Sequence, residues 1–315
     1  MGFEYYLELV VWFLEFKIMI PFVKYKNIFF GFTLMAILAS VAAIAVWGLK
    51  PGVEFTGGSV LEIEWRQDRP DNALIREKID ALEIGGASLY AVGDNGVIIR
   101  AESISPEKHA ALLNSLGEIG EFEEKSFEGI GPVVGKELAD KMATLVFVSL
   151  AAMLLYIAVA FRNIPGRIKS WQYGVASFLI LCHDIIVPLG VFALLGARYG
   201  AQITIPVITA LLIVVGYAIN NVIVVYDRVR ENLSRDHRAD FGENANRAVN
   251  QTLSRQINTS LLTLLPVFAI YFWGGASLNH FALALILGIA VGTYSSVFLA
   301  AQSLVFWRDL RDRKR

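Results

Sequence analysis

Six apolar stretches alternate with polar segments along the chain, and each is long enough or nearly long enough to cross a membrane. They cover residues 28–49, 139–161, 171–195, 204–226, 257–273 and 279–306, the fifth being the shortest. A helical span needs roughly 20 predominantly apolar residues. The pattern therefore predicts an α-helical polytopic membrane protein with six transmembrane helices.

The segment 51–138 is polar and has periodicities of its own. Residues 59–65 (SVLEIEW) alternate apolar and acidic side chains, as in a strand with one wet face. Further strands are predicted over 87–92, 96–101 and 118–126, and helices over 71–82 and 105–116, the second opened by Ser105 as cap and Pro106 at the first helical position. The resulting order β-α-β-β-α-β is the ferredoxin-like pattern. The lone His109 is predicted to be solvent-exposed.

Composition supports a membrane protein and excludes several other classes. The chain has 315 residues, of which 55% are hydrophobic, and a net charge of −1, which argues against a nucleic-acid partner. The single cysteine, Cys182, excludes an intrachain disulfide. Residues 1–20 place acidic and aromatic residues together, which predicts an amphipathic helix at the bilayer surface rather than a cleavable signal. No metal, cofactor or catalytic motif such as H-E-x-x-H or G-x-S-x-G is found, so no enzyme activity is predicted.

The distribution of Lys and Arg predicts the orientation. Basic residues precede the first run, separate the second from the third and the fourth from the fifth, and fill the tail. Because short cytoplasmic loops carry the excess of basic residues, both termini are expected in the cytoplasm and the ferredoxin-like domain outside. The expected organisation is a cytoplasmic or interfacial segment 1–27, a first helix 28–50, the extracytoplasmic domain 51–138, a five-helix region 139–306 with a cytoplasmic loop 227–256, and a basic tail 307–315.

Four polar residues in or beside the apolar runs are the candidates for function: Asp184, Asn220, Asn221 and Arg255. Polar side chains at membrane depth are costly and usually face a bundle interior or a water path. Asp184 is the only carboxylate well inside a predicted span, and its neighbour His183 points about 100° away around an ideal helix, so the two need not act together. A structural role remains open for each, as interhelical hydrogen bonds for the asparagines and Asp184, or as an interfacial anchor for Arg255.

Arg255 has two polar companions on its helix. Asn258 and Thr259 follow it by three and four residues, so all three share one helix face. We expect this face to point into the bundle, where a fixed positive charge would favour the ionised form of a nearby carboxylate. In the sixth run, Gly288 and Gly292 form a small-xxx-small pair that predicts close helix packing.

Six strings occur in a fixed order along the chain: GVEFTGGS with its core Phe55, Thr56, Gly57 and Gly58, then GPVVGKEL, His183–Asp184, GYAINNVIVVYDRVREN with Gly216, Tyr217, Asp227 and Arg228, QTLSRQINTS, and FALALILGIAVGTYSSVF. Together they resemble the SecD–SecF family of protein-export membrane proteins, which is of the resistance-nodulation-division type. Asp227 and Arg228 also fit a solvated cytoplasmic end of the fourth helix. The family usually has Asp at the position of Glu54. It also usually has Asp at the position of Asn221.

The resemblance implies a function and partners. It implies the SecF half of a motor in the bacterial or archaeal cytoplasmic membrane that pairs with SecD, associates with the SecYEG channel and uses protons or sodium ions to help finish export of a preprotein. It places Asn221 and Arg255 in the ion path. Since an amide cannot titrate, Asn221 resembles a protonated aspartate fixed in one state. Two alternatives stay open: a non-energised or state-trapped scaffold subunit, and a half-transporter for another substrate such as a lipid, drug or metal.

Overall fold

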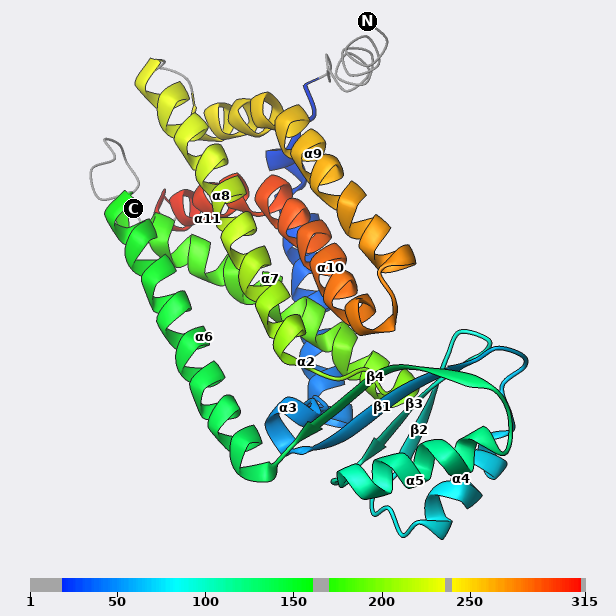
Figure 1. The fold of residues 1–315 in the computed structure, drawn as a ribbon. Coiled ribbons are helices and arrows are strands. Elements are labelled where there is room, and N and C mark those ends of the chain that lie inside the picture. Colours follow the sequence, from blue (N-terminus) through cyan, green and yellow to red (C-terminus); the bar gives the residue numbers. More distant parts are fainter. Residues whose placement is uncertain (1–18, 161–169, 236–239, 313–315) are drawn as a thin grey trace, which may run out of the picture. The chain divides into compact units, whose positions relative to one another are not determined.

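The computed structural model describes residues 19–160, 170–235 and 240–312, and the predicted helix over residues 1–20 lies almost entirely outside them. The chain forms two compact units. The helical unit comprises residues 1–48, 147–194 and 206–315, and the second unit, which contains the only described sheet, comprises 49–146 and 195–205. Figure 1 shows the helices and the sheet.

Among the described residues, six helices are long and apolar enough to cross a membrane, which agrees with the prediction of six spans. They are α2 (Lys26–Trp47), α6 (Pro132–Ala160), α7 (Ser170–Tyr199), α8 (Ile205–Arg235), α9 (Phe241–Trp273) and α10 (Ala276–Phe298). The short 3-10 helix η1 (Phe22–Tyr25) leads into α2, and α11 (Ala300–Asp312) follows α10.

Large apolar side chains lie on the outside of these helices, as expected for helices surrounded by lipid. Leu38 is 60% exposed and Phe147 74% exposed. Water-soluble monomers rarely expose contiguous apolar patches of this kind. Lipid tails are as apolar as leucine, so these positions carry no penalty in a bilayer.

The last apolar run is not one helix, contrary to the expectation of a span over 279–306. Leu299 leaves the helical path of α10, and α11 turns away from it (Figure 1). Two ion pairs hold α11 against other helices: Lys26 with Asp309, and Arg308 with Asp240 at 2.6 Å. Composition alone could not reveal the break, because residues 299–306 are as apolar as a span.

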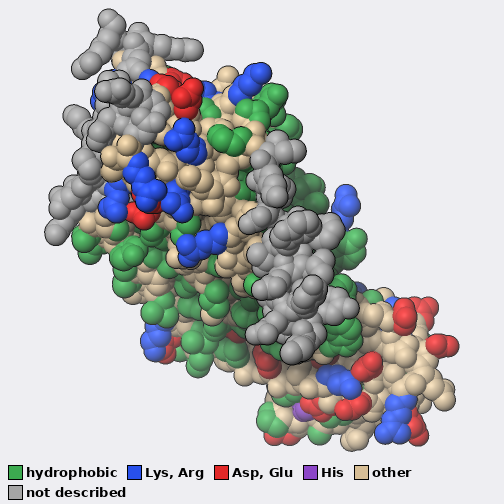
Figure 2. Space-filling view, turned by 90° about the horizontal axis from the view of Figure 1, so that it is seen from above, with side chains coloured by type: hydrophobic (Ala, Val, Ile, Leu, Met, Phe, Trp, Pro, Cys, Tyr) green, Lys and Arg blue, Asp and Glu red, His purple; other side chains and the backbone are tan. Residues whose placement is uncertain are grey.

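The expected cytoplasmic loop 227–256 is also mostly helical, since α8 continues to Arg235 and α9 begins at Phe241. Asp240 caps α9 by accepting a hydrogen bond from the Gly242 backbone N–H at 2.8 Å. Figure 2 shows Lys and Arg side chains gathered at this end of the helical unit.

The second unit has the predicted ferredoxin-like order. Its elements are β1 (Gly58–Trp65), α4 (Asn72–Ala81), β2 (Ser88–Val92), β3 (Gly96–Ala101), α5 (Pro106–Gly117) and β4 (Phe122–Ile130), preceded by α3 (Val53–Thr56). The sheet is antiparallel with strand order β2-β3-β1-β4. Inward-facing residues of β1 and β3, such as Leu61 and Ile99, are fully buried with Ile75 of α4 and Leu112 of α5. The α+β fold class is confirmed.

Two details of this unit differ from the sequence predictions. The fourth strand runs over 122–130 instead of 118–126, because Ile119 still bonds back to Leu116 at the end of α5. His109 is half-buried instead of exposed. Its ring stacks on Phe127 with 3.8 Å between ring centroids, and its Nε2 lies 3.2 Å from Glu124 Oε1.

The paired glycines at the start of β1 make a tight turn. Gly57 and Gly58 have φ of +73° and +131°, which side chains rarely adopt. A Cβ on Gly57 would lie 2.7 Å from Pro132 Cα, and one on Gly58 would lie 2.8 Å from the Ala101 carbonyl oxygen. The motif therefore closes β1 against the start of α6 and the end of β3.

Candidate ion-coupling site

Asp184 is the central polar residue of the helical unit. Its side chain has no solvent exposure. One carboxylate oxygen lies 2.9 Å from His183 Nδ1, and the other accepts a hydrogen bond from Ser295 Oγ of α10 at 2.8 Å. The expectation that the His183 and Asp184 side chains point apart is wrong, because the two side chains are in contact.

Close packing of α10 against α8 brings Ser295 to this carboxylate. A Cβ on Gly288 would lie 2.4 Å from Val214 Cγ2, and one on Gly292 would lie 3.1 Å from the Ala218 Cβ. The same Cβ on Gly292 would approach Asp184 Oδ2 to 3.9 Å. The predicted packing role of the two glycines is thereby confirmed.

Asn220 and Asn221, although adjacent, face different surroundings. Asn221 is 3% exposed, and its Nδ2 has no hydrogen-bond partner among the described residues. Asn220 is exposed on the surface of the helical unit. A buried amide without a hydrogen-bond partner lowers the free energy of unfolding by about 1–3 kcal/mol. The Asn221 side chain is therefore in an energetically unfavourable position.

Arg255 lies on the outside of this chain. Its side chain and that of Thr259 are exposed, and Thr259 Oγ1 only bonds back to the Arg255 carbonyl at 2.7 Å. Asn258 is partly buried. The expectation that the face with Arg255 and Thr259 points into the bundle is therefore not met within this chain. The opposite face of α9 points into the bundle instead.

A network of hydroxyl and amide groups joins α8, α9 and α10, and of its members only Tyr217 is among the residues singled out from the sequence. Ser260 Oγ lies 2.7 Å from Tyr217 Oη and 2.6 Å from Thr293 Oγ1. One turn away, Gln256 Oε1 accepts a hydrogen bond from Ser296 Oγ. Four of these residues lie in the strings QINTS (256–260) and TYSS (293–296), whose hydroxyl and amide side chains are the sequence signal for the network. Gln256 and Ser260 are four residues apart, which places them on one helix face.

The other motif positions of α8 have plainer roles. Asp227 pairs with Arg230 at 2.8 Å, and Arg228 with Glu231 at 2.6 Å, both three residues apart along the helix. Such exposed pairs contribute little stability. These four residues form the exposed end of α8. Gly216 has room around it, since a Cβ there would meet only the methyl group of Met153, at 3.8 Å.

Outside the six long apolar helices, Glu54, which directly precedes the FTGG core, is a half-buried carboxylate. Burial raises its pKa above the ordinary value of 4.5, and Glu128 acts in the same direction. Backbone N–H groups of Glu54 itself and Ile205, and the charge of Arg100, oppose the shift without cancelling it. Arg100 is in turn held by the Gly200 carbonyl at 2.8 Å and by the Tyr90 ring.

We expect Glu54→Gln to stabilise the protein above the raised pKa and to have less effect below it. Because the pKa of Glu54 is higher in the folded state than in the unfolded state, the contribution of Glu54 to the free energy of unfolding is greatest at low pH. This contribution declines as the pH rises through the raised pKa. The measurement is the thermal midpoint of the full chain in detergent, at about pH 4 and about pH 8. Glu107→Gln is the control of opposite sign, because a hydrogen bond from Ser105 lowers the pKa of Glu107. A midpoint gain independent of pH would contradict the assignment.

No group of three or more His, Cys, Asp and Glu side chains that could hold a metal ion occurs among the described residues. The polar centre of the helical unit instead combines one carboxylate, one imidazole, amides and hydroxyls. Groups of these kinds can exchange protons or bind a small cation through oxygen atoms.

The fold and this centre define a class: a multi-pass membrane protein of transporter type with one ferredoxin-like domain outside the bundle. The profile of the family "Protein export membrane protein SecD/SecF, C-terminal" matches residues 109–310. Protein translocase subunit SecF of Thermobaculum terrenum is 34% identical over 303 residues, which cover 92% of this chain and 95% of the relative. The chain therefore belongs to the SecD/SecF family, as a SecF-type protein translocase subunit.

Further relatives agree with this assignment. SecF of Vibrio alginolyticus is 34% identical over 292 residues, covering 90% of this chain and 88% of the relative. The crystal structure of SecDF, a translocon-associated membrane protein from Thermus thermophilus, superposes with a TM-score of 0.82 at 33% identity over 93% of this chain. This chain spans only 39% of that SecDF chain.

Proposed function

We propose that the chain is the SecF-type half of a motor that uses the proton or sodium gradient to assist a late step of preprotein translocation through SecYEG. The observation that carries the proposal is the fully buried Asp184, bonded to His183 and Ser295 inside the bundle. Ionisable groups at membrane depth are expensive and mark ion or proton paths by default. Because the chain belongs to a protein-export family, we infer that the transported substrate is a preprotein.

We also propose that SecD is the partner. The Thermus thermophilus relative is named SecDF, and the matched part makes up 37% of it, which leaves room for a second half. Asn220, Arg255 and Thr259 are polar and exposed on this chain, at or beside the apolar stretches. A polar surface at this depth is unfavourable against lipid and is satisfied by a neighbouring protein helix. We therefore expect SecD to cover it.

Export by reconstituted vesicles tests the proposal. Vesicles would contain the Sec channel and its ATPase together with this chain alone, SecD alone, or both, and the release of a folded secreted reporter would be measured with and without an imposed gradient. The expected gain requires both subunits and disappears when the gradient is collapsed. A gain that persists without a gradient would instead support the scaffold alternative, which the inability of the Asn221 amide to titrate favours.

The proposed topology puts both termini in the cytoplasm and the ferredoxin-like unit outside. In a Cys182→Ser background, Asp94→Cys in the exposed turn between β2 and β3 is expected to react with a membrane-impermeant maleimide in intact spheroplasts. Ser234→Cys, at the exposed end of α8, is the matched control and should react only after lysis. The reverse labelling pattern would invert the orientation.

A further inference from the structure

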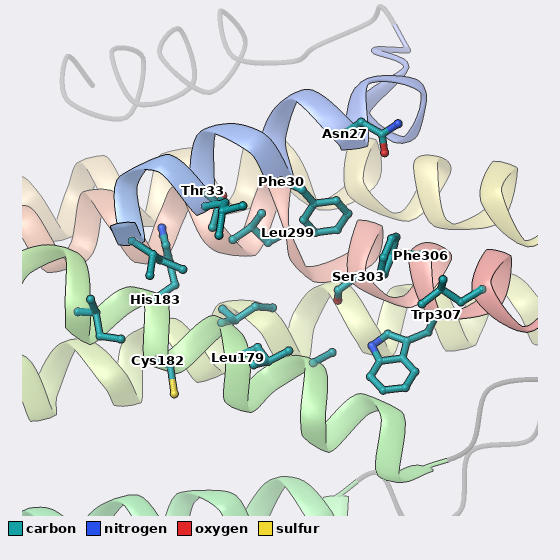
Figure 3. A pocket seen from close by; sticks show the side chains of 16 residues that line it. Asn27, Phe30, Thr33, Leu179, Cys182, His183, Leu299, Ser303, Phe306 and Trp307 are labelled. Carbon is teal, nitrogen blue, oxygen red and sulfur yellow. The ribbon is translucent and has the colours of Figure 1, made fainter. Parts of the chain in front are cut away.

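An apolar groove runs along the helical unit between α2, α7 and α11 (Figure 3). Its volume is about 630 Å³. Apolar side chains from all three helices line it, among them Phe30, Leu34 and Ile37 of α2, Leu179 of α7 and Leu310 of α11. Ten of its sixteen lining residues have purely hydrocarbon side chains, so the groove is unsuited to a file of water molecules.

The groove has the length of one lipid leaflet. Its residues on α2 run from Asn27 to Ile37 at spacings of three and four, which is a single helix face. Ten residues of helix rise about 15 Å. The hydrocarbon core of a bilayer is about 30 Å thick, so the groove reaches from one interface to roughly the middle of the membrane.

One end of the groove has the residues of a membrane interface. Trp307 lines it there and packs edge-to-face on Trp171, with 5.1 Å between ring centroids. Tryptophan is enriched at the level of lipid headgroups. Asn27 lies at the same end, as Figure 3 shows. Lys24, three residues before Asn27, is exposed and has no carboxylate partner among the described residues.

We propose that the groove binds an anionic phospholipid of the adjacent leaflet. One acyl chain lies along Phe30, Leu34 and Ile37, and the phosphate lies at the interfacial end, near Lys24 and Asn27. The groove's length and apolar lining fit the chain, and the uncompensated ammonium selects a negative headgroup. His183 lines the inner part of the groove, so a bound chain shields the His183–Asp184 pair from water on that side. The proposal does not depend on the coupling mechanism.

Native mass spectrometry of the full-length chain in detergent tests the acyl-chain part. The probes are dioleoyl phosphatidylglycerol and dioleoyl phosphatidylcholine. Leu34→Trp and, from the other wall, Leu179→Trp fill the groove and are expected to weaken phosphatidylglycerol binding at least fivefold. Leu38→Trp is the matched control: Leu34 and Leu38 are 58% and 60% exposed on the same helix, but only Leu34 lines the groove. Equal binding by the Leu34 and Leu38 variants would overturn the proposal.

The headgroup part has its own comparison. Wild-type protein is expected to prefer phosphatidylglycerol over phosphatidylcholine severalfold, and Lys24→Gln to remove that preference. Lys50→Gln is the control, since Lys50 is also exposed but follows the opposite end of α2. Absence of a preference in the wild type, or its survival in Lys24→Gln, would overturn the proposal. A thermal midpoint within a few degrees of wild type shows that each variant is folded.

Discussion

Asp184→Asn is expected to remove the gradient-dependent part of export while leaving the gradient-independent part intact. The substitution keeps the shape of the side chain, and its amide oxygen can still accept the hydrogen bond from Ser295. What it removes is the ability to gain and lose a proton or to attract a cation. The measurement is reporter release from vesicles with and without an imposed gradient.

Two comparisons separate coupling from folding. Asp227→Asn changes a carboxylate on the exposed end of α8, where an ion pair with Arg230 contributes little, and should leave export unchanged. Asp184→Asn should assemble with SecD at the wild-type level, because isosteric replacement leaves the packing of α7 and α10 in place. Full gradient-dependent export by Asp184→Asn would show that the buried carboxylate is structural.

The fold could be predicted from the sequence because its signals are local. Runs of apolar residues determine the six spans, and alternation with capping residues determines the ferredoxin-like unit, where Asp71 and Ser105 cap α4 and α5 as their positions suggest. The break at Leu299 could not be predicted in this way. The break is accompanied by ion pairs between residues far apart in the sequence, Lys26 with Asp309 and Asp240 with Arg308, which no local pattern indicates.

The candidate site was predicted only in part, since burial depends on which helix face meets which neighbour. A carboxylate inside a span is conspicuous, so Asp184 was found, whereas Ser260 and Thr293 are unremarkable in sequence and become significant only when α9 packs on α10. Ideal helix geometry places the His183 and Asp184 side chains about 100° apart around the helix. In the structure, rotation of the side chains brings them into contact. Asn220 and Asn221 differ by one position, and only the structure shows that the second is buried.

Asn221→Asp is expected to increase gradient-dependent export severalfold. The residue is buried in α8, and its Nδ2 has no hydrogen-bond partner among the described residues, so replacing the NH₂ group by oxygen removes no bond of that group. It adds a group that can be neutral when protonated and charged when not, which an amide never is. Reporter release from the same vesicles, with and without a gradient, is the measurement.

The neighbouring asparagine provides the matched control. Asn220→Asp introduces the same carboxylate one residue away on the exposed face of α8 and should give no gain. The family resemblance places Arg255 in the same ion path, so Arg255→Ala combined with Asn221→Asp is expected to abolish the gain; an arginine charge in that path would favour the ionised form of a carboxylate. Arg255 is exposed on this chain, so its effect should appear only in vesicles that also contain SecD. If Asn221→Asp leaves export and its gradient dependence unchanged, or if Asn220→Asp gives the same gain, coupling does not run through position 221 and Asp184 remains the sole carboxylate candidate in the described spans.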